Sequence, residues 1–426
     1  MNQRRPTRST RTPPRKPTRA NLGAGLITGA ADDDPSGIAT YSQAGAQFGL
    51  AMLWTVWFTL PLMIGIQAVC AHVGRVTGRG LAANMSQLFP RPLTAAVVVL
   101  LLAANVFNLA ADIGAMGEAT SMLIGGSGAL YALALAVLSV VLEVAVPFAR
   151  YSRVLKLMTI SLFAYVLTAA VVHVPWLAAL RHLVVPTLRP DRSYLVMVVA
   201  MFGTTISPYM FFWQAAQEVE EEEQAHEEPL LLQPQDAPRS FHRIDLDTVV
   251  GMAFSNVVGF FVVLVAAVVL HGHGVTGIHS AADAAQALRP LAGPFAGAVF
   301  ATGIVGTGLL AIPVLAGSGA YALAEVCRWS YGLDRRFGEA KLFYLIIVLA
   351  TAAGALLSLS SVKPMRMLFW AAVLNGVVSM PLMAAVMYLA TRHRVMGRLV
   401  VKGWLRAFGW LATVAMAAVV VAMFFG

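Results

Sequence analysis

Long apolar stretches separated by short polar segments fill the chain from residue 22 to its end. Most of these stretches reach the roughly 20 residues that an α-helix needs to cross the hydrocarbon core of a bilayer. The pattern therefore predicts an all-α membrane protein with eleven transmembrane helices, at 22–48, 50–72, 93–118, 122–147, 155–177, 194–217, 247–270, 294–324, 343–361, 367–391 and 404–425.

Composition agrees with this pattern. Of the 426 residues, 58% are hydrophobic and only 12% are charged, and the mean hydropathy is +0.73. About 25% of the residues in a soluble globular protein are charged, so a soluble enzyme and a disordered chain are excluded. The two cysteines, Cys70 and Cys327, support neither a disulfide framework nor a cysteine metal cluster. The sequence has no P-loop, Gly-x-Ser-x-Gly or His-Glu-x-x-His pattern, so we expect no enzymatic activity and no cofactor.

The basic residues predict the orientation in the membrane. With the N-terminus in the cytoplasm, 24 of the 30 Lys and Arg residues fall on the cytoplasmic side. The C-terminus is then extracytoplasmic. Residues 1–20 hold seven Lys or Arg and no acid, which indicates a disordered cytoplasmic tail near anionic lipid. The net charge of +9 therefore points to the lipid bilayer as partner, with no nucleic acid partner. No removable signal peptide is expected.

Two of the predicted spans are interrupted by polar residues and proline. The first contains three consecutive aspartates followed by Pro35, and the sixth contains Pro208 directly after hydroxyl residues. A carboxylate inside a bilayer is costly unless it is solvated, paired or bound to a cation. Broken backbone is tolerated there only where it lines a cavity or is buried in protein. These two spans are therefore the candidates for a binding site.

The places of the two interrupted spans suggest an internal repeat. One opens the first block of five helices and the other opens the second, which is the arrangement of 5+5 inverted repeats with a midplane substrate site. We expect a first repeat over 21–180 and a second over 194–391. The last helix, 404–425, then lies outside the repeat.

The residues of both interrupted spans resemble those of a known family. DDDPSGIATYSQAGAQFGLAMLW (32–54), IGIQAVCAHVGRVTGRGLA (64–82) and TTISPY (204–209) resemble motifs of the Nramp divalent-metal transporters. The resemblance implies a LeuT-like fold with broken helices 1 and 6, a divalent metal ion as substrate, and a place in a bacterial plasma membrane.

The resemblance also implies a metal site. The family's metal-binding aspartate falls on Asp34, and its metal-binding asparagine falls on Gly37, which has no side chain. The alanine whose carbonyl binds metal falls on Thr204, and the methionine that supplies a sulfur ligand falls on Ser207. Asp33 and Thr205 are added as neighbouring candidate ligands.

The family's residues for proton movement are only partly retained. Asp112 keeps an aspartate, whereas a glutamate falls on Ala115 and a histidine falls on Tyr209. Tyrosine titrates about three units above histidine, which is too high to shuttle protons near neutral pH. Asp112, Tyr209 and Asn375 are placed on the conduction pathway.

These differences favour one cargo over others. Loss of the soft thioether removes the preference for Mn²⁺ or Fe²⁺ over hard ions. A roomy site with one carboxylate suits partly hydrated Mg²⁺. The pattern resembles the Nramp-related magnesium transporters. We therefore expect a secondary transporter that favours Mg²⁺, with Mn²⁺ as a further cargo, by alternating access without proton coupling. The alternatives are a proton-coupled Mn²⁺/Fe²⁺ importer, a symporter of a small organic solute and a non-transporting metal sensor.

Each candidate residue also has a simpler structural interpretation. Asp34 precedes proline and so predicts a helix cap, a role that can coexist with metal binding. Thr204, Thr205 and Ser207 could satisfy backbone groups freed by the break, and Asn375 could form interhelical hydrogen bonds.

Most of the remaining polar residues are predicted to have no part in metal binding or transport. Neighbours on a helix point about 100° apart, so Asp32 and Asp33 are not expected to face the same point. Glu118 and Glu143 are expected near helix ends. The acidic segment 218–246 is predicted to be a solvated, mobile loop. A second solvated loop is predicted for the segment that carries His271, His273 and His279.

Overall fold

The computed structural model describes residues 24–146, 150, 158, 160–333 and 335–425, so the basic tail predicted over 1–20 lies outside the described residues. The regular elements in the described part of the chain are all helical. The first half contains α1 (Ala24–Asp32), α2 (Pro35–Phe48), α3 (Leu53–Thr77), α4 (Leu81–Leu88), α5 (Arg91–Ile124), α6 (Gly128–Ala145), α8 (Phe163–Val171) and α9 (Trp176–Val184). The second half contains α10 (Arg192–Thr205), α11 (Pro208–Ala225), α12 (Ala237–Val265), α13 (Ala281–Ala285), α14 (Arg289–Ala292), α15 (Ala296–Cys327), α16 (Lys341–Ser358), α17 (Pro364–Ala390), α18 (His393–Met396) and α19 (Gly403–Phe425).

The predicted apolar segments coincide with these helices. Nine helical stretches of the described residues are long and apolar enough to cross a membrane. One of them, Pro35–Thr77, joins parts of two predicted spans. The predicted span 155–177 is represented by a shorter apolar stretch, Ile160–Val171. An all-helical protein with many apolar spans is therefore confirmed, while the number eleven and the orientation stay predictions.

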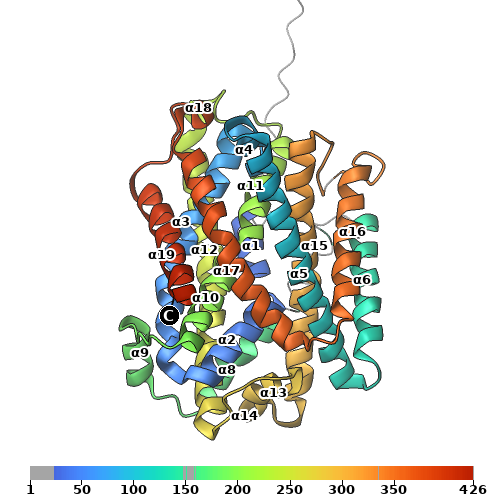
Figure 1. Cartoon of the computed structure of the whole chain (residues 1–426), viewed down its shortest axis with the longest axis vertical. Coiled ribbons are helices and arrows are strands. Elements are labelled where there is room, and N and C mark those ends of the chain that lie inside the picture. Colours follow the sequence, from blue (N-terminus) through green and yellow to red (C-terminus); the bar gives the residue numbers. More distant parts are fainter. Residues whose placement is uncertain (1–23, 147–149, 151–157, 159, 334, 426) are drawn as a thin grey trace, which may run out of the picture.

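The interrupted helices lie in the middle of the bundle. Figure 1 shows α1, α10, α11 and α12 near its centre, with α6 and α16 along one side and α3 and α19 along the other. The outer helices expose large apolar side chains, as helices in contact with lipid do. These include Leu130, Val137 and Val141 on α6, Leu345, Leu349 and Leu356 on α16, and Leu411, Val414 and Val421 on α19.

Glycines let the central helices approach closely. A Cβ atom on Gly29 of α1 would lie 2.2 Å from the carbonyl oxygen of Gly251 on α12. A Cβ on Gly203 of α10 would lie 2.1 Å from the carbonyl oxygen of Ala372 on α17. Small residues at such contacts are typical of helix packing in membranes. They fix the positions of both broken helices against their neighbours.

Candidate functional site

The first helix break is organised by Asp34. Helix α1 ends at Asp32 and α2 begins at Pro35, with Asp34 in extended conformation as the N-cap of α2. The backbone N–H of Gly37 donates a hydrogen bond to Asp34 Oδ1 at 2.7 Å. The helix cap expected from the sequence is therefore present. Because the cap uses one carboxylate oxygen, Oδ2 is left to face the second break.

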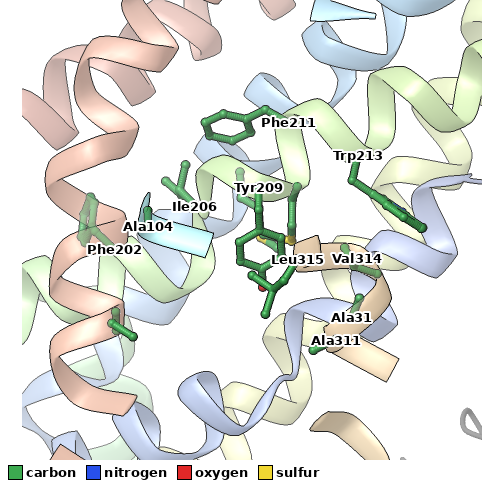
Figure 2. Close-up of a cluster of buried hydrophobic side chains, with 14 of the residues drawn as sticks. Ala31, Ala104, Phe202, Ile206, Tyr209, Phe211, Trp213, Ala311, Val314 and Leu315 are labelled. Atoms are coloured by element: carbon green, nitrogen blue, oxygen red, sulfur yellow. The ribbon is translucent and has the colours of Figure 1, made fainter. Parts of the chain in front are cut away.

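At Asp34 Oδ2 the two breaks meet. The Tyr209 hydroxyl of α11 donates a hydrogen bond to this oxygen at 3.1 Å, and Asp34 and Tyr209 are both buried. Figure 2 shows Tyr209 among apolar side chains, beside Leu315 and close to Ile206. The fold thus brings together Asp34 and Tyr209, which are 175 positions apart in the chain. An apolar surrounding strengthens any interaction of this carboxylate with a cation.

The hydroxyls of the second break are turned back onto their own helix. Ser207 Oγ donates to the carbonyls of Gly203 and Thr204, at 2.8 and 3.1 Å. Thr205 Oγ1 donates to the carbonyl of Met201 at 2.9 Å. The structural interpretation of Ser207 and Thr205 therefore holds, because these hydroxyls cap carbonyls near the end of α10. Their oxygen lone pairs remain able to accept or to bind a cation.

Gly37 marks a point surrounded by oxygen atoms. A Cβ atom placed on Gly37 would lie 3.2 Å from the Asp32 carbonyl oxygen, 3.4 Å from Thr204 Oγ1 and 3.5 Å from Asp34 Oδ1. The structure therefore brings Asp34, Gly37 and Thr204 together, as the sequence predicted. A carboxylate, a carbonyl and a hydroxyl are the donor types that hard cations prefer in proteins.

Asp32 and Asp33 lie differently from the prediction. Ser255 Oγ on α12 is 2.5 Å from Asp32 Oδ2 and 3.1 Å from Asp33 Oδ1, so both carboxylates reach the same hydroxyl. The expectation that they could not face one point was wrong. Its premise was a continuous helix, but α1 ends at Asp32, so the 100° step does not apply to Asp33.

Of the predicted pathway residues, Asp112 lies near Asp34, and Asn375 forms hydrogen bonds between two helices. Asp112 is buried on α5 and lies close enough to Asp34 and to the Ser36 backbone N–H to interact electrostatically with both. Asn375 instead exchanges two hydrogen bonds with Asn108, at 2.8 and 3.1 Å. This pair holds α5 and α17 together, which is the interhelical role considered as the alternative.

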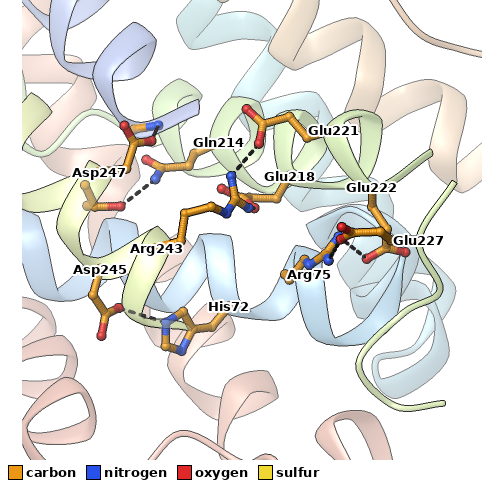
Figure 3. Close-up of polar contacts among 12 residues, drawn as sticks. His72, Arg75, Gln214, Glu218, Glu221, Glu222, Glu227, Arg243, Asp245 and Asp247 are labelled. Carbon is orange, nitrogen blue, oxygen red and sulfur yellow. Dashed lines mark hydrogen bonds and ion pairs between the residues drawn. The ribbon is translucent and has the colours of Figure 1, made fainter. Parts of the chain in front are cut away.

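The acidic segment is a helix and not a loop over most of its length. Helix α11 continues to Ala225 and α12 begins at Ala237. Glu218 and Glu222 are buried and form ion pairs with Arg243, at 2.7 Å, and Arg75, at 3.2 Å (Figure 3). The prediction of a solvated loop over 218–246 was therefore wrong. Pairing across helices, which one sequence does not display, keeps these charges inside the protein.

The ion pairs close one end of the bundle. Figure 3 shows Arg75 of α3 and Arg243 of α12 reaching the glutamates of α11, with His72 beside Asp245. His72 Nε2 lies 2.8 Å from Asp245 Oδ1. We call this the ion-pair end. The sequence reasoning did not single out Arg75, Arg243 or His72, although a basic residue that ends an apolar span was a usable signal.

The opposite end of the bundle holds a cavity. Its volume is about 440 Å³, and its lining includes Gly114, Glu118, His279 and Lys363. Gly114 and Glu118 place the cavity beside the C-terminal half of α5. Glu118 accepts a hydrogen bond from the backbone N–H of Ala281 at 2.8 Å, close to the end of α5 as expected. We call this the cavity end.

The other acids and histidines do not form a metal centre. In the parts of the chain that the structure describes, no three His, Cys, Asp or Glu side chains group in a way that could hold a metal ion. His271 and His273 place their Nδ1 atoms 2.8 and 2.7 Å from the backbone carbonyls of Ala46 and Val269. Histidine side chains often hydrogen-bond the free carbonyls near a helix C-terminus in this way. Glu143 is buried in the last turn of α6, and its carboxylate has no hydrogen-bond partner among the residues that the structure describes.

Comparison with known proteins identifies the class. The family model described as natural resistance-associated macrophage protein-like matches residues 25–426. The chain therefore belongs to the Nramp family, a transporter family, and is not an enzyme. This confirms the resemblance drawn from residues 32–82 and 204–209.

The individual relatives share less than a third of their residues with this chain. The chain is 27% identical over 406 residues to the divalent metal cation transporter MntH of Burkholderia ambifaria, covering 92% of this chain and 86% of the relative. It is 28% identical over 292 residues to the MntH of Verminephrobacter eiseniae, covering 67% of this chain and 64% of the relative.

Two solved structures share the fold. A mutant of the Eremococcus coleocola manganese transporter matches with a TM-score of 0.73 at 14% identity. The match covers 95% of this chain and 87% of the transporter chain. MHP1, a nucleobase-cation-symport-1 family transporter, has a TM-score of 0.56 at 12% identity, covering 97% and 95%. Both support the LeuT-like fold.

Proposed function

We propose that the chain carries divalent metal cations across the membrane by alternating access, binding them where the two helix breaks meet. One observation supports this proposal most directly: the buried Asp34 carboxylate shares an oxygen-lined point at Gly37 with Thr204 Oγ1 and the Asp32 carbonyl. A buried charge of this kind is costly without a counterion. A transported cation would supply that counterion for part of the cycle.

Mn²⁺ is our first candidate for the cargo. The relatives are named as divalent metal cation transporters, and the solved structure with a similar fold is named as a manganese transporter. Mn²⁺ also accepts carboxylate, carbonyl and water ligands, which are the donor types around Gly37. The proton-coupled Mn²⁺/Fe²⁺ importer that the sequence left as an alternative therefore has more support for its cargo than the magnesium transporter.

Mg²⁺ is the second candidate, because the two positions at which the family has asparagine and methionine ligands offer no soft donor in this chain. Gly37 contributes no side chain and Ser207 contributes a hydroxyl. Mg²⁺ binds through one or two carboxylates and keeps several of its waters, which suits a site with Asp34 as its carboxylate and few other side-chain ligands. The magnesium-transporting branch is thus a proposal about selectivity within the family.

We propose that the membrane potential drives uptake without an obligatory proton. The positions that the family uses for proton movement hold Tyr209 and Ala115, and Tyr209 keeps its hydrogen on a bond to Asp34. A divalent ion gains about 4.6 kcal/mol per 100 mV when the inside is negative. Asp112 is the carboxylate that would carry a proton if coupling occurs.

The wider architecture stays part of the proposal. We infer two inverted repeats, 21–180 and 194–391, with a final helix at 404–425, because the breaks before Pro35 and Pro208 occupy the first helix of each repeat. We also infer a cytoplasmic N-terminus and an extracytoplasmic C-terminus from the distribution of Lys and Arg.

Metal uptake into proteoliposomes tests the cargo and the coupling together. A trapped metal-quenched dye reports Mn²⁺ entry, competition by external Mg²⁺ or Cd²⁺ reports selectivity, and a trapped pH dye reports protons. We expect uptake that Mg²⁺ competes for better than Cd²⁺, and Ser207→Met should reverse that order by adding a soft ligand. Internal acidification together with Mn²⁺ entry would establish the proton-coupled alternative.

Removal of the central carboxylate tests the site itself. Asp34→Asn should abolish uptake, whereas Glu143→Gln, which removes a buried carboxylate far along the chain on α6, should leave it unchanged. Uptake by Asp34→Asn at the wild-type rate would refute the assigned site. Flux of amino acids and no metals would favour the organic-solute symporter, and no flux of either would favour the sensor.

A further inference from the structure

We propose a second divalent-cation site, separate from the Asp34 site, formed by Asp32, Asp33, Ser255 and Tyr41. It rests on the proposed function in one respect, since it would take the same hard cation. Asp34 directs its oxygens to Gly37 N–H and to the Tyr209 hydroxyl, between α2 and α11. Asp32 and Asp33 direct theirs to α12. The two sets of oxygens therefore define two positions.

Two carboxylates contact the single hydroxyl group of Ser255. Its hydroxyl oxygen lies 2.5 Å from Asp32 Oδ2 and 3.1 Å from Asp33 Oδ1, but a serine hydroxyl carries a single hydrogen. The two carboxylates share this one hydrogen, so the repulsion between the three electron-rich oxygens is only partly offset. A cation that touches all three oxygens would remove this repulsion.

Two further buried oxygens support a ligand at this position. Asp32 Oδ1 and the Tyr41 hydroxyl are both buried and have no hydrogen-bond partner among the described residues. The Tyr41 ring lies against Gly259, one helical turn beyond Ser255 on α12. Its hydroxyl interacts electrostatically with Asp32 most strongly and then with Asp33. Buried polar atoms normally have partners, so two unpartnered oxygens beside the pair point to a ligand.

The helix packing makes this position rigid. A Cβ on Gly25 would lie 2.7 Å from the Thr248 backbone nitrogen, and a Cβ on Gly29 would lie 2.2 Å from the Gly251 carbonyl oxygen. Contacts therefore repeat about every four residues along α1 and α12, and the next repeat brings Asp32 to Ser255. Because two close backbone contacts fix this register, Asp32 and Ser255 stay on facing turns of the two helices.

Charge and donor type identify the class of ligand. All the atoms are oxygens, and in the described part of the chain neither Asp32 nor Asp33 forms an ion pair with Lys or Arg. Two carboxylates balance one divalent ion, and oxygen donors select hard ions such as Mn²⁺ and Mg²⁺. Asp32 closes α1, the helix that leads away from Asp34 toward the start of the chain. We assign the second site to a cation that has left, or is about to reach, Asp34.

Counting bound Mn²⁺ tests the second site. The purified full chain is titrated with Mn²⁺ in lipid nanodiscs, and free Mn²⁺ is measured by electron paramagnetic resonance. We expect two Mn²⁺ per wild-type chain, one in the variant that combines Asp32→Asn with Asp33→Asn, and one in Asp34→Asn. Ser255→Ala should weaken one of the two sites by about tenfold or more, since it removes a hydroxyl ligand shared by two charges.

Variants that keep the packing make the result specific. Tyr41→Phe keeps the ring against Gly259 and should weaken only the second site. Glu143→Gln should still bind two Mn²⁺. The Mn²⁺ retained at Asp34 in the double asparagine variant shows that this variant is folded.

The outcomes separate this inference from the proposed function. A single Mn²⁺ in the wild type, removed by Asp34→Asn and unaffected by the changes at Asp32 and Asp33, would overturn the second site and leave the proposed function standing. If a Mn²⁺ ion depends on Asp32 and Asp33 and its binding is unaffected by Asp34→Asn, the second site would stand and the proposed site at Asp34 would be overturned. Occupancy of the second site by Na⁺ in place of Mn²⁺ would also overturn the divalent assignment.

Discussion

Gly37→Ala is a change that should separate transport from stability. Gly37 lies in the first turn of α2, and its backbone is helical, so alanine fits the conformation without strain. The new methyl would occupy the point that Asp34 Oδ1, Thr204 Oγ1 and the Asp32 carbonyl surround. The substitution thus places carbon among the oxygens between which we place the cation, while keeping every oxygen in place.

The distances give the size of both effects. Contacts of 3.2, 3.4 and 3.5 Å from the methyl carbon are tight but need shifts of only a few tenths of an ångström. Alanine in place of a helical glycine gains about 1 kcal/mol, which offsets much of that crowding. Cation–oxygen distances are about 2.0–2.6 Å, so a cation cannot share the space. We expect stability within about 1 kcal/mol of the wild type and a loss of Mn²⁺ affinity of at least about tenfold, or 1.4 kcal/mol.

Two measurements on each variant decide the question. Mn²⁺ uptake into proteoliposomes reports transport, and thermal unfolding in detergent reports stability. Gly297→Ala is a matched control, because a Cβ there meets only the Met122 side chain at 3.5 Å and more. Gly37→Asn should bind Mn²⁺ more tightly than Gly37→Ala, since the amide oxygen is itself a ligand. Wild-type uptake by Gly37→Ala at unchanged stability would refute a cation position at this point.

Three further changes test other parts of the structure. Tyr209→Phe removes the hydrogen bond to Asp34 and should change Mn²⁺ affinity by about tenfold, measured by titration; unchanged affinity would mean that the bond is not made in the cation-bound state. Arg243→Ala leaves the buried Glu218 without this partner and should lower the free energy of unfolding by about 1–3 kcal/mol in a denaturation experiment, since the Arg243 side chain is 45% exposed and water can enter in its place. Gly29→Ala meets backbone at 2.2 Å and should lower the unfolding temperature markedly, in contrast to a control at Gly297; equal melting would show that α1 is not held against α12.

Local sequence signals were sufficient for the helix breaks and for part of the site. Proline removes a backbone donor, and an acid before it caps the following helix, so Pro35 and Pro208 predicted both interruptions and Asp34 predicted its own cap. The proximity of the two breaks followed from the expectation that two interrupted helices meet at one place. These conclusions need only neighbouring residues or a symmetric arrangement of helices.

Contacts between distant helices could not be predicted in the same way. Ser255 is one of several hydroxyl residues in apolar spans, and nothing near it in the chain indicates that α12 faces Asp32. That register depends on Gly25 and Gly29, whose role is visible only once both helices are placed. The pairing of Arg75 with Glu222 has the same origin, because an acidic run without its partners is typical of a solvated segment.

The two ends of the bundle differ in a way that constrains the transport cycle. Asp34 is buried, a cavity lies at the cavity end beside α5, and Arg75 and Arg243 hold α11 at the ion-pair end. Release of a cation through the ion-pair end requires those pairs to separate. Separation in a dry interior would cost about 3–5 kcal/mol for each pair, whereas exposed pairs are worth only about 0–1 kcal/mol. Opening at this end must therefore bring in water together with the helix movement, so hydration of Glu218 and Glu222 and exit of the cation are parts of the same step.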